Sequence, residues 1–351
     1  MNVTKDESGP SDNKRQRFMD SYVVKTSKST ATANTDTSVA EKEMLADHMR
    51  SAHVKSSLGR KTEKEFRHYM TSKYTALCLE SLPHRWFRVI FDQNSGMDGG
   101  EERANSDSTA STLNAALSAE KRLICPQPME NMWKWARAIP DPDGVRVVVV
   151  GQDPYHTVFR KHDGTTVTMA DGLAFSVNPE YARLGKPLPP SLVNIMKLAD
   201  SAFKSRRFDE NGFQGDLTAW TENGVLPLNT TLTTVEGIPN AHSNIGWDRV
   251  TDRILQWLGR KSTDDNELKR SARIFMLWGK NARDAMDFID RSTHVCLTNC
   301  HPSPMSANTY GWFENDNFKD ANLFLRTLGH PPVPWSCRHR PHGEYKKLAN
   351  E

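Results

Sequence analysis

Four short runs of apolar residues constrain the fold of this chain more than any other feature. Within each run the apolar residues follow one another without alternation, which is typical of parallel strands covered on both faces. Helical spacing of apolar residues fills the intervals, as in the segments that start at Pro190 and Trp247. This order predicts an α/β fold, a doubly wound four-stranded parallel sheet flanked by helices. The predicted strands are VRVVVV (145–150), GVLPLN (224–229), ARIFMLWG (272–279) and HVCLTN (294–299).

The composition changes along the 351 residues of the chain. Residues 1–64 are rich in Ser, Thr, Asp and Lys and poor in clustered apolar residues, so we expect a disordered N-terminal tail. Residues 65–351 are expected to form one folded domain. Within it, the Gly-, Ser- and acid-rich segment 92–112 is expected to be a surface insertion without core residues.

Charge and cysteine content narrow the class of protein. Lys and Arg number 46 and Asp and Glu 43, and the net charge of +3 is too small to identify a nucleic-acid partner. Five cysteines without a CxxC pair argue against a disulfide framework or a zinc ribbon. No apolar run approaches the roughly 18 residues of a membrane span. The polar, acidic start MNVTKDESGPSDN is neither a signal nor a transit peptide, which favours a cytoplasmic or nuclear protein.

Polar residues follow each predicted strand. GQDPYH (151–156) follows the first strand, and Asn229 ends the second. Gly279 and Lys280 stand at the end of the third, and HPSPMS (301–306) follows the fourth. Because ligands of doubly wound sheets bind beyond the carboxyl ends of the strands, we expect these groups to form one site that suits a nucleotide.

The motifs GQDPYH, GLAFSV (172–177), LPLN (226–229) and HPSPMS, in this order, resemble those of the family 1 uracil-DNA glycosylases. The resemblance covers roughly residues 66–336. It implies an enzyme that flips uracil out of DNA and hydrolyses its N-glycosidic bond, which starts base excision repair. It also implies a four-stranded parallel sheet, no metal or cofactor, and a monomer that acts on single- or double-stranded DNA.

The resemblance assigns Asp153 and His301 to catalysis. Asp153 would stabilise the cationic sugar and act as general base toward water, while His301 would donate a hydrogen bond to the O2 atom of the departing uracil. For substrate binding it assigns Phe175 as the stacking ring and Asn229 as the amide that recognises uracil. Tyr155 would exclude the methyl group of thymine, and Gln152 would contact the same pocket. From residue type alone, Phe175 and Tyr155 also suit a core, and Asn229 suits a cap.

The resemblance also implies a set of DNA contacts: Ser191, Gly279, Lys280, Ser303, Met305 and Ser306. Three residues depart from the family pattern. Met305 stands where the family has a wedging leucine, and Lys280 stands where a serine is typical, so a steeper salt dependence of DNA binding is expected. Pro227 replaces a leucine in the second strand, which predicts a lost ladder hydrogen bond or a bulge.

Residues 157–172 make a longer link than the family has between its first two motifs. Arg160, Lys161 and His162 lie there, and two interpretations remain open: contact with DNA, or a solvated insertion.

The predicted tail contains an apolar pattern of its own. Gln16, Met19 and Tyr22 have the spacing of peptides that dock on replication sliding clamps, although a chance apolar cluster explains the pattern equally well. Residues 41–56 suit a second partner-binding helix. We expect the protein in the nucleus, with the mitochondrion or cytoplasm as further locations.

Three rival functions are consistent with such a chain. One is a catalytically idle DNA-damage-binding module on the same fold, and another is a glycosylase of broader base range. The third is a nucleotide-binding or metal-dependent hydrolase that uses Asp153, His156, His162 and Asp163, but the chain lacks the glycine spacing that cradles phosphate.

Overall fold

The computed structural model describes residues 54–55, 57–92, 99–203, 215–261 and 271–335. The expected disorder of residues 1–53 therefore lies outside the described residues. The last part of the predicted tail is wrong, because Leu58 is only 3% exposed in the hydrophobic core. Thr62 caps helix α3 (Glu63–Lys73) by accepting a hydrogen bond from the Glu65 N–H. The folded domain thus begins before residue 65.

A four-stranded parallel sheet forms the centre of the molecule. Its strands are β2 (Val147–Gly151), β5 (Val225–Asn229), β7 (Ile274–Trp278) and β8 (Val295–Asn299), in the spatial order β5-β2-β7-β8. Each strand overlaps a predicted apolar run, and every residue of β2, β5 and β7 is buried. The predicted sheet is confirmed.

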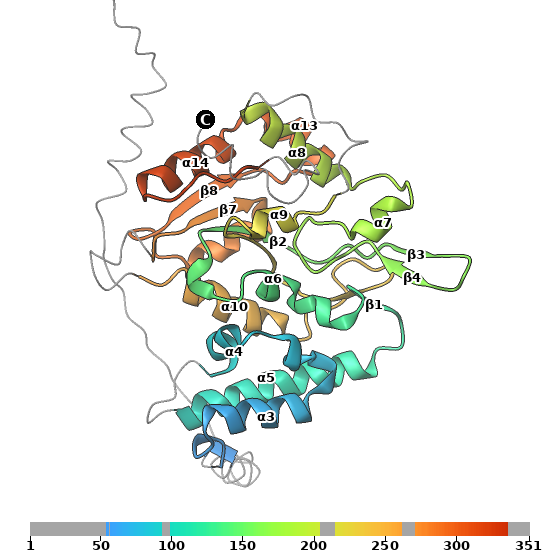
Figure 1. Ribbon diagram of the computed structural model, residues 1–351, viewed down its shortest axis with the longest axis vertical. Helices are drawn as coiled ribbons and strands as arrows, with labels where there is room; N and C mark the ends of the chain where they lie inside the picture. The colour runs from blue at the N-terminus through green and yellow to red at the C-terminus, as the bar shows by residue number, and fades with distance from the viewer. Residues whose placement is uncertain (1–53, 56, 93–98, 204–214, 262–270, 336–351) are drawn as a thin grey trace, which may run out of the picture.

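Helices cover both faces of the sheet, which accounts for the continuous apolar runs (Figure 1). Side chains of β2 alternate between the two faces. Val147 and Val149 pack in one cluster with α8 (Pro190–Ala202) and α14 (Asn317–Thr327). Val148 and Val150 pack in the other with α4 (His84–Phe91) and α10 (Trp247–Leu258). The doubly wound architecture predicted from the sequence is therefore correct.

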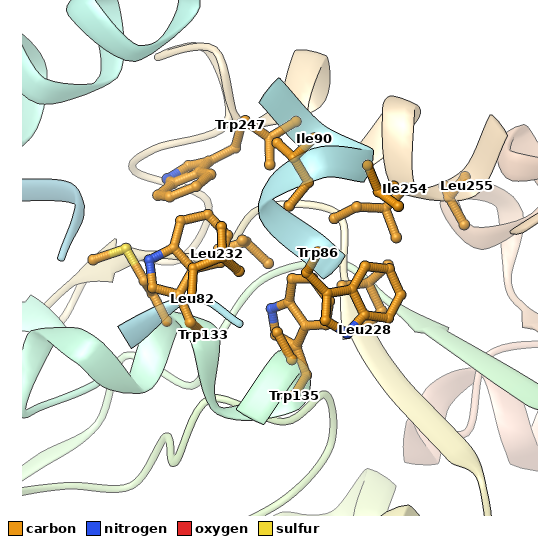
Figure 2. Packing of buried hydrophobic residues seen from close by; sticks show 14 of the residues in the cluster. Leu82, Trp86, Ile90, Trp133, Trp135, Leu228, Leu232, Trp247, Ile254 and Leu255 are labelled. Atoms are coloured by element: carbon orange, nitrogen blue, oxygen red, sulfur yellow. The ribbon is translucent and has the colours of Figure 1, made fainter. Parts of the chain in front are cut away.

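Tryptophans dominate the core on the α4 and α10 side, as Figure 2 shows. The rings of Trp86 and Trp135 meet edge to face with 4.9 Å between centroids. The indole N–H of Trp86 donates to the carbonyl of Ile139, and that of Trp133 donates to the carbonyl of Leu77. The hydrogen bonds of Trp86 and Trp133 join the segments before β2 to one another, and the cluster packs these segments against Val148 and Val150 of the sheet.

Most of the predicted surface insertion belongs to a core helix, which corrects the prediction for segment 92–112. Helix α5 spans Gly99–Ala119 and buries residues 103, 106, 110, 113 and 117 along one stripe. Arg103 forms an ion pair with Asp92, with 2.7 Å between Nε and Oδ1, and both side chains are almost fully buried. The prediction failed because the stripe contains Arg, Ser and Ala, so its apolar content is low.

Two small antiparallel pairs accompany the central sheet: β1 (Ile124–Cys125) with β6 (Thr234–Val235), and the hairpin β3 (Val158–Arg160) with β4 (Thr166–Thr168). None of the helices in the described ranges is long and apolar enough to cross a membrane. The remaining elements are η1 (Thr75–Leu77), η2 (Leu79–Ser81), η3 (Met129–Trp133), α6 (Lys134–Ala138), η4 (Pro142–Gly144), α7 (Pro179–Arg183), α9 (Thr218–Thr221), α12 (Lys280–Arg283), η5 (Asp284–Phe288), α13 (Pro304–Tyr310) and η6 (Trp312–Glu314).

Candidate active site

The carboxyl ends of the four parallel strands bring the predicted site residues to one edge of the sheet. Strand β2 leads into Asp153, and β5 ends at Asn229. Strand β7 is followed by Lys280, and β8 by the loop that carries His301. Because the strands are parallel, these ends lie side by side, as the sequence predicts.

A cavity of about 320 Å³ lies at this edge. Asp153, Tyr155 and Asn229 are not in its lining. Asn229 borders it, since a Cβ added to the lining residue Gly151 would lie 2.3 Å from the Asn229 Oδ1. The cavity is large enough for a small ring compound. Its lining consists of Val150, Gly151, Gln152, Phe175, Trp278, Gly279, Lys280, Asn281, Ala282, His301 and Ser303.

Asp153 is held by a backbone donor from another segment. The N–H of Asn240 donates to its carboxylate with 2.7 Å between N and Oδ2. Burial raises the pKa of Asp153 because the charged carboxylate loses hydration, whereas the Asn240 N–H and the nearby His156 lower it. A carboxylate held in this way can stabilise a cation or accept a proton from water.

The imidazole of His301 is oriented by its own loop. The N–H of Ser303 donates to Nδ1 at 3.0 Å, so the neutral ring carries its proton on Nε2. Burial lowers the pKa of His301, which favours this neutral form. Gly279 gives the ring room, because its φ is 92° and a Cβ there would lie 3.1 Å from the Cβ of His301. His301 is therefore a fixed donor at the cavity wall.

Phe175 presents an aromatic ring to the cavity from a left-handed backbone position with φ of 63°. Its ring centroid lies 5.8 Å from that of Trp278 and 6.2 Å from that of His301. The hydroxyl of Tyr155 donates to the Phe175 carbonyl at 3.2 Å, and burial raises the pKa of Tyr155, which stays neutral. Phe175 is half-buried, so part of its surface remains open to the cavity.

Comparison with known proteins gives the family. The family model described as the uracil DNA glycosylase superfamily matches residues 140–326, more than half of the chain. The chain belongs to this superfamily. The resemblance to uracil-DNA glycosylases seen in the four motifs is thereby confirmed at the level of the superfamily, and family 1 is consistent with it.

Relatives of this glycosylase are found in distant organisms. The uracil-DNA glycosylase of Haemophilus influenzae (strain 86-028NP) is 38% identical over 193 residues, which are 55% of this chain and 76% of the relative. That of Azotobacter vinelandii (strain DJ / ATCC BAA-1303) is 39% identical over 202 residues, or 57% and 74%. The crystal structure of mimivirus uracil-DNA glycosylase matches with a TM-score of 0.59 and 24% identity, and it covers 73% of this chain and 88% of that one. This last match shows that the fold is shared.

The predicted DNA-contact residues of the glycosylase lie at the starts of three helices, of which α8 and α13 are tied together. Ser191 is in the first turn of α8, and Ser303 precedes α13. The side-chain amide of Asn194 on α8 donates to the carbonyl of Pro302 at 2.9 Å. Met305 in the first turn of α13 is 84% exposed, which is unusual for a large apolar side chain. Ser306 is half-buried on α13, and Lys280 is exposed on α12.

Pro227 does not disturb its strand, which corrects the predicted bulge. Strand β5 is at the edge of the sheet, and its register with β2 continues through the pair Val149–Pro227 to Asn229. The carbonyl of Pro227 accepts a hydrogen bond from the Ala174 N–H, on the side away from β2. The missing N–H of the proline therefore faces the outer edge, where no ladder bond is lost.

The extra residues 157–172 fold into the β3–β4 hairpin rather than an open loop. Arg160 forms a two-pronged ion pair with Glu236, and Lys161 pairs with Glu180. Both cations thus have partners within the protein. Residues 162–165 are exposed, so of the two interpretations of this segment the structure favours a solvated insertion over a set of free cations for DNA.

Three supporting residues of the glycosylase site were not predicted. Asn240 contacts Asp153, and Asn194 joins the two serine loops. Buried Asp171 accepts hydrogen bonds from the Leu173 N–H and the Ser176 hydroxyl, and so shapes the loop of Phe175. These contacts join residues that are far apart in the sequence or lie within one short loop, and they leave no motif in the sequence. The described residues contain no group of three or more His, Cys, Asp or Glu that could hold a metal ion.

Proposed function

We propose that this chain is a monofunctional uracil-DNA glycosylase that hydrolyses the N-glycosidic bond of uracil in DNA. One observation carries the proposal. A neutral imidazole with its proton on Nε2 lines a cavity at the same sheet edge as a carboxylate, in a chain of this superfamily. Cleavage leaves positive charge on the sugar and negative charge on the base, and each needs an opposite partner placed in advance.

Asp153 and His301 divide this work. As the bond between N1 and C1′ breaks, the Asp153 carboxylate stabilises the cationic sugar. It then accepts a proton from the water whose oxygen bonds to C1′. The Nε2–H of His301 donates to uracil O2 as negative charge builds there, and the base leaves as an anion that takes a proton from solvent. No general acid is required.

Uracil is selected by shape and hydrogen bonding. Phe175 stacks on the base, and the Asn229 amide offers an acceptor and a donor to N3–H and O4. Cytosine presents the opposite pattern, so a fixed amide rejects it. Tyr155 stands against C5, where thymine carries a methyl group. The hydrogen bond from the Tyr155 hydroxyl to the Phe175 carbonyl supports this arrangement, because it holds Tyr155 against the loop that carries the stacking ring.

Base flipping precedes the chemistry. Rotating a base out of the duplex costs a few kcal/mol, which an apolar wedge offsets by filling the gap. The exposure of Met305 supports its role as that wedge. Ser191, Ser303 and Ser306 would contact the DNA backbone, where small hydroxyls let phosphates approach closely.

Release of free uracil from a uracil-containing oligonucleotide tests the proposal. The parent protein should release uracil but neither cytosine nor thymine, and Asp153→Asn should lower kcat by at least about a hundredfold. Asp163→Asn is the matched control, because Asp163 is at the hairpin tip and an asparagine can still accept the Thr165 N–H. A parent protein that binds the DNA without releasing uracil would support the idle-module alternative instead.

For the tail we propose a sliding-clamp contact through Gln16, Met19 and Tyr22, in a nuclear and monomeric protein. These residues lie outside the described ones, so only their spacing supports the contact. A peptide of residues 14–24 should bind a purified clamp in calorimetry, and the double variant Met19→Ala/Tyr22→Ala should not. Equal binding of both peptides would refute the contact.

The oligomeric state and the nuclear location are tested separately. Light scattering of the purified protein should give the mass of a monomer, and microscopy of the tagged protein should place it in the nucleus.

A further inference from the structure

The segment 236–240 supports the catalytic carboxylate although no motif marks it. It follows β6 and ends at Asn240, whose backbone adopts a left-handed conformation with φ of 55°. Asparagine is one of the few residues other than glycine that adopt this conformation readily. The contacts of its N–H and its side chain show what the conformation achieves here.

Asn240 holds two consecutive residues of the GQDPYH loop through different atoms. Its backbone N–H donates to the Asp153 Oδ2 at 2.7 Å. Its side-chain Oδ1 accepts a hydrogen bond from the Gln152 Nε2 at 2.8 Å. The left-handed backbone thus allows one residue to fix both the carboxylate and the loop that carries it.

The segment is itself held at several points. The N–H of Glu236 donates to the Leu123 carbonyl at 2.8 Å, and the N–H of Gly237 donates to the His156 carbonyl at 2.9 Å. The Thr234 hydroxyl donates to the Ile238 carbonyl. Backbone hydrogen bonds from both sides therefore fix the path of the chain that ends at Asn240.

The β3–β4 hairpin adds one more attachment. The guanidinium of Arg160 donates a hydrogen bond to each carboxylate oxygen of Glu236, and this contact lowers the pKa of Glu236. Arg160 is 59% and Glu236 30% exposed, so the pair contributes modestly. The insertion thus reaches the segment that holds Asp153, whereas Lys161 pairs with Glu180 on a different segment.

We propose that Asn240 is a positioning residue for Asp153, and that the Arg160–Glu236 pair of the hairpin holds the segment on which Asn240 lies. This inference rests on the proposed function. It assigns the insertion a role in ordering the active site, in place of contact with DNA.

Single-turnover and steady-state uracil release test the role of Asn240. Alanine keeps the backbone N–H but disfavours the left-handed conformation, so in Asn240→Ala this N–H should move away from the Asp153 carboxylate. We expect kcat to fall about tenfold to a hundredfold with KM within about twofold, because a displaced carboxylate no longer fits the transition state. The acid limb of the pH profile should move to higher pH, since a weaker hydrogen bond to Asp153 raises its pKa. His156, which also lowers that pKa, is unchanged in the variant.

Asn240→Asp separates positioning from folding. Aspartate tolerates the left-handed backbone and keeps the acceptor for Gln152, but it adds a negative charge beside Asp153. Its acid limb should shift to higher pH while kcat on the alkaline plateau stays within about threefold of the parent. The limb shift reports the added charge, and the recovery of kcat relative to Asn240→Ala reports the positioning, because aspartate keeps the backbone conformation and the contact with Gln152.

The hairpin is tested with a double-mutant cycle. Arg160→Gln and Glu236→Gln should each lower kcat about twofold to fivefold, and the double variant should be no worse than either. Lys161→Gln is the matched control, because it breaks an ion pair of the same hairpin on another segment. Its kcat and pH profile should equal those of the parent.

Each result decides a different point. A parent that releases no uracil contradicts the proposed function, whatever the variants do. With an active parent, a folded Asn240→Ala protein that keeps the parent kcat and acid limb overturns the positioning role, as does a change confined to KM. Equal losses in Arg160→Gln and Lys161→Gln would overturn the role of the hairpin and point to DNA contact.

Discussion

Burial shifts the pKa values of the two ionisable groups of the site in opposite directions. It lowers the pKa of His301, a cation when protonated, and raises the pKa of Asp153, an anion when ionised. A backbone donor holds each group: the Asn240 N–H opposes the effect of burial on the Asp153 carboxylate, whereas the Ser303 N–H favours the neutral His301 imidazole, as burial does. At the scale of single residues, the chemistry therefore depends on donors that belong to neighbouring backbone.

The pH dependence of kcat/KM follows from these directions. In the proposed mechanism Asp153 is ionised and His301 is neutral, so both active forms are the deprotonated ones. Activity should fall on the acid side as pH drops through the raised pKa of Asp153 and the lowered pKa of His301. In His301→Leu the limb should remain, because Asp153 still titrates, at a rate about a hundredfold lower. A pH-independent parent would contradict both assignments.

Gly279→Ala should damage catalysis through His301. The new methyl group meets the His301 Cβ at 3.1 Å, and a φ of 92° is strained for alanine. We expect kcat to fall about tenfold with a smaller change in KM. Gly164→Ala is the control, because that glycine has φ of 83° but no neighbour within 4 Å of the added carbon. It should lose stability alone, as measured by thermal unfolding and uracil release.

At the scale of elements, short helices at the sheet edge carry residues that are predicted to contact DNA. Helix α13 exposes Met305, and α12 exposes Lys280. The Asn194 amide joins α8 to the loop before α13. Loops placed by a rigid sheet are a common location for binding residues.

Met305→Ala should separate duplex from single-stranded activity. The side chain is exposed, so the free energy of unfolding should change by less than about 0.5 kcal/mol. Uracil release from duplex DNA should fall several-fold more than release from single strands, where no stack must be opened. Leu323→Ala, which truncates another exposed apolar side chain, should affect neither substrate. Equal duplex activity of Met305→Ala and parent would exclude the wedge.

Lys280→Ser should weaken the salt dependence of DNA binding. Removal of one cation that neutralises a phosphate lowers the slope of log K against log salt concentration by about one unit. Fluorescence anisotropy at several salt concentrations measures that slope. Lys319→Ser, which removes a lysine paired with Asp316, is the control and should leave the slope unchanged. An unaltered slope in Lys280→Ser would place this lysine outside the DNA interface.

At the scale of the whole molecule, the segments before β2 form part of one of the two layers that enclose the sheet. Helices α4 and α5 pack with α10 on one side, and the tryptophan cluster lies among these elements (Figures 1 and 2). The buried pair Arg103–Asp92 joins α5 to the end of α4. The catalytic edge thus depends on a layer that carries no catalytic motif.

Arg103→Leu should therefore destabilise the whole domain. Removing one partner leaves the Asp92 carboxylate buried without its cation, which costs about 3–5 kcal/mol in urea unfolding. Lys55→Gln breaks the exposed pair with Glu101 on the same helix and should cost less than about 1 kcal/mol. Similar small costs for both variants would mean that α5 contributes little to the core.

The amino-acid sequence alone predicts the four strands, their burial on both faces and the polar groups at their ends, because continuous apolar runs and strand-end motifs are local patterns. Four motifs also identify the family. The core role of α5, the harmless edge position of Pro227 and the support of Asp153 by Asn240 emerge only from the folded arrangement. Each of these depends on which distant segment packs beside a residue, and no spacing along the chain encodes that neighbour.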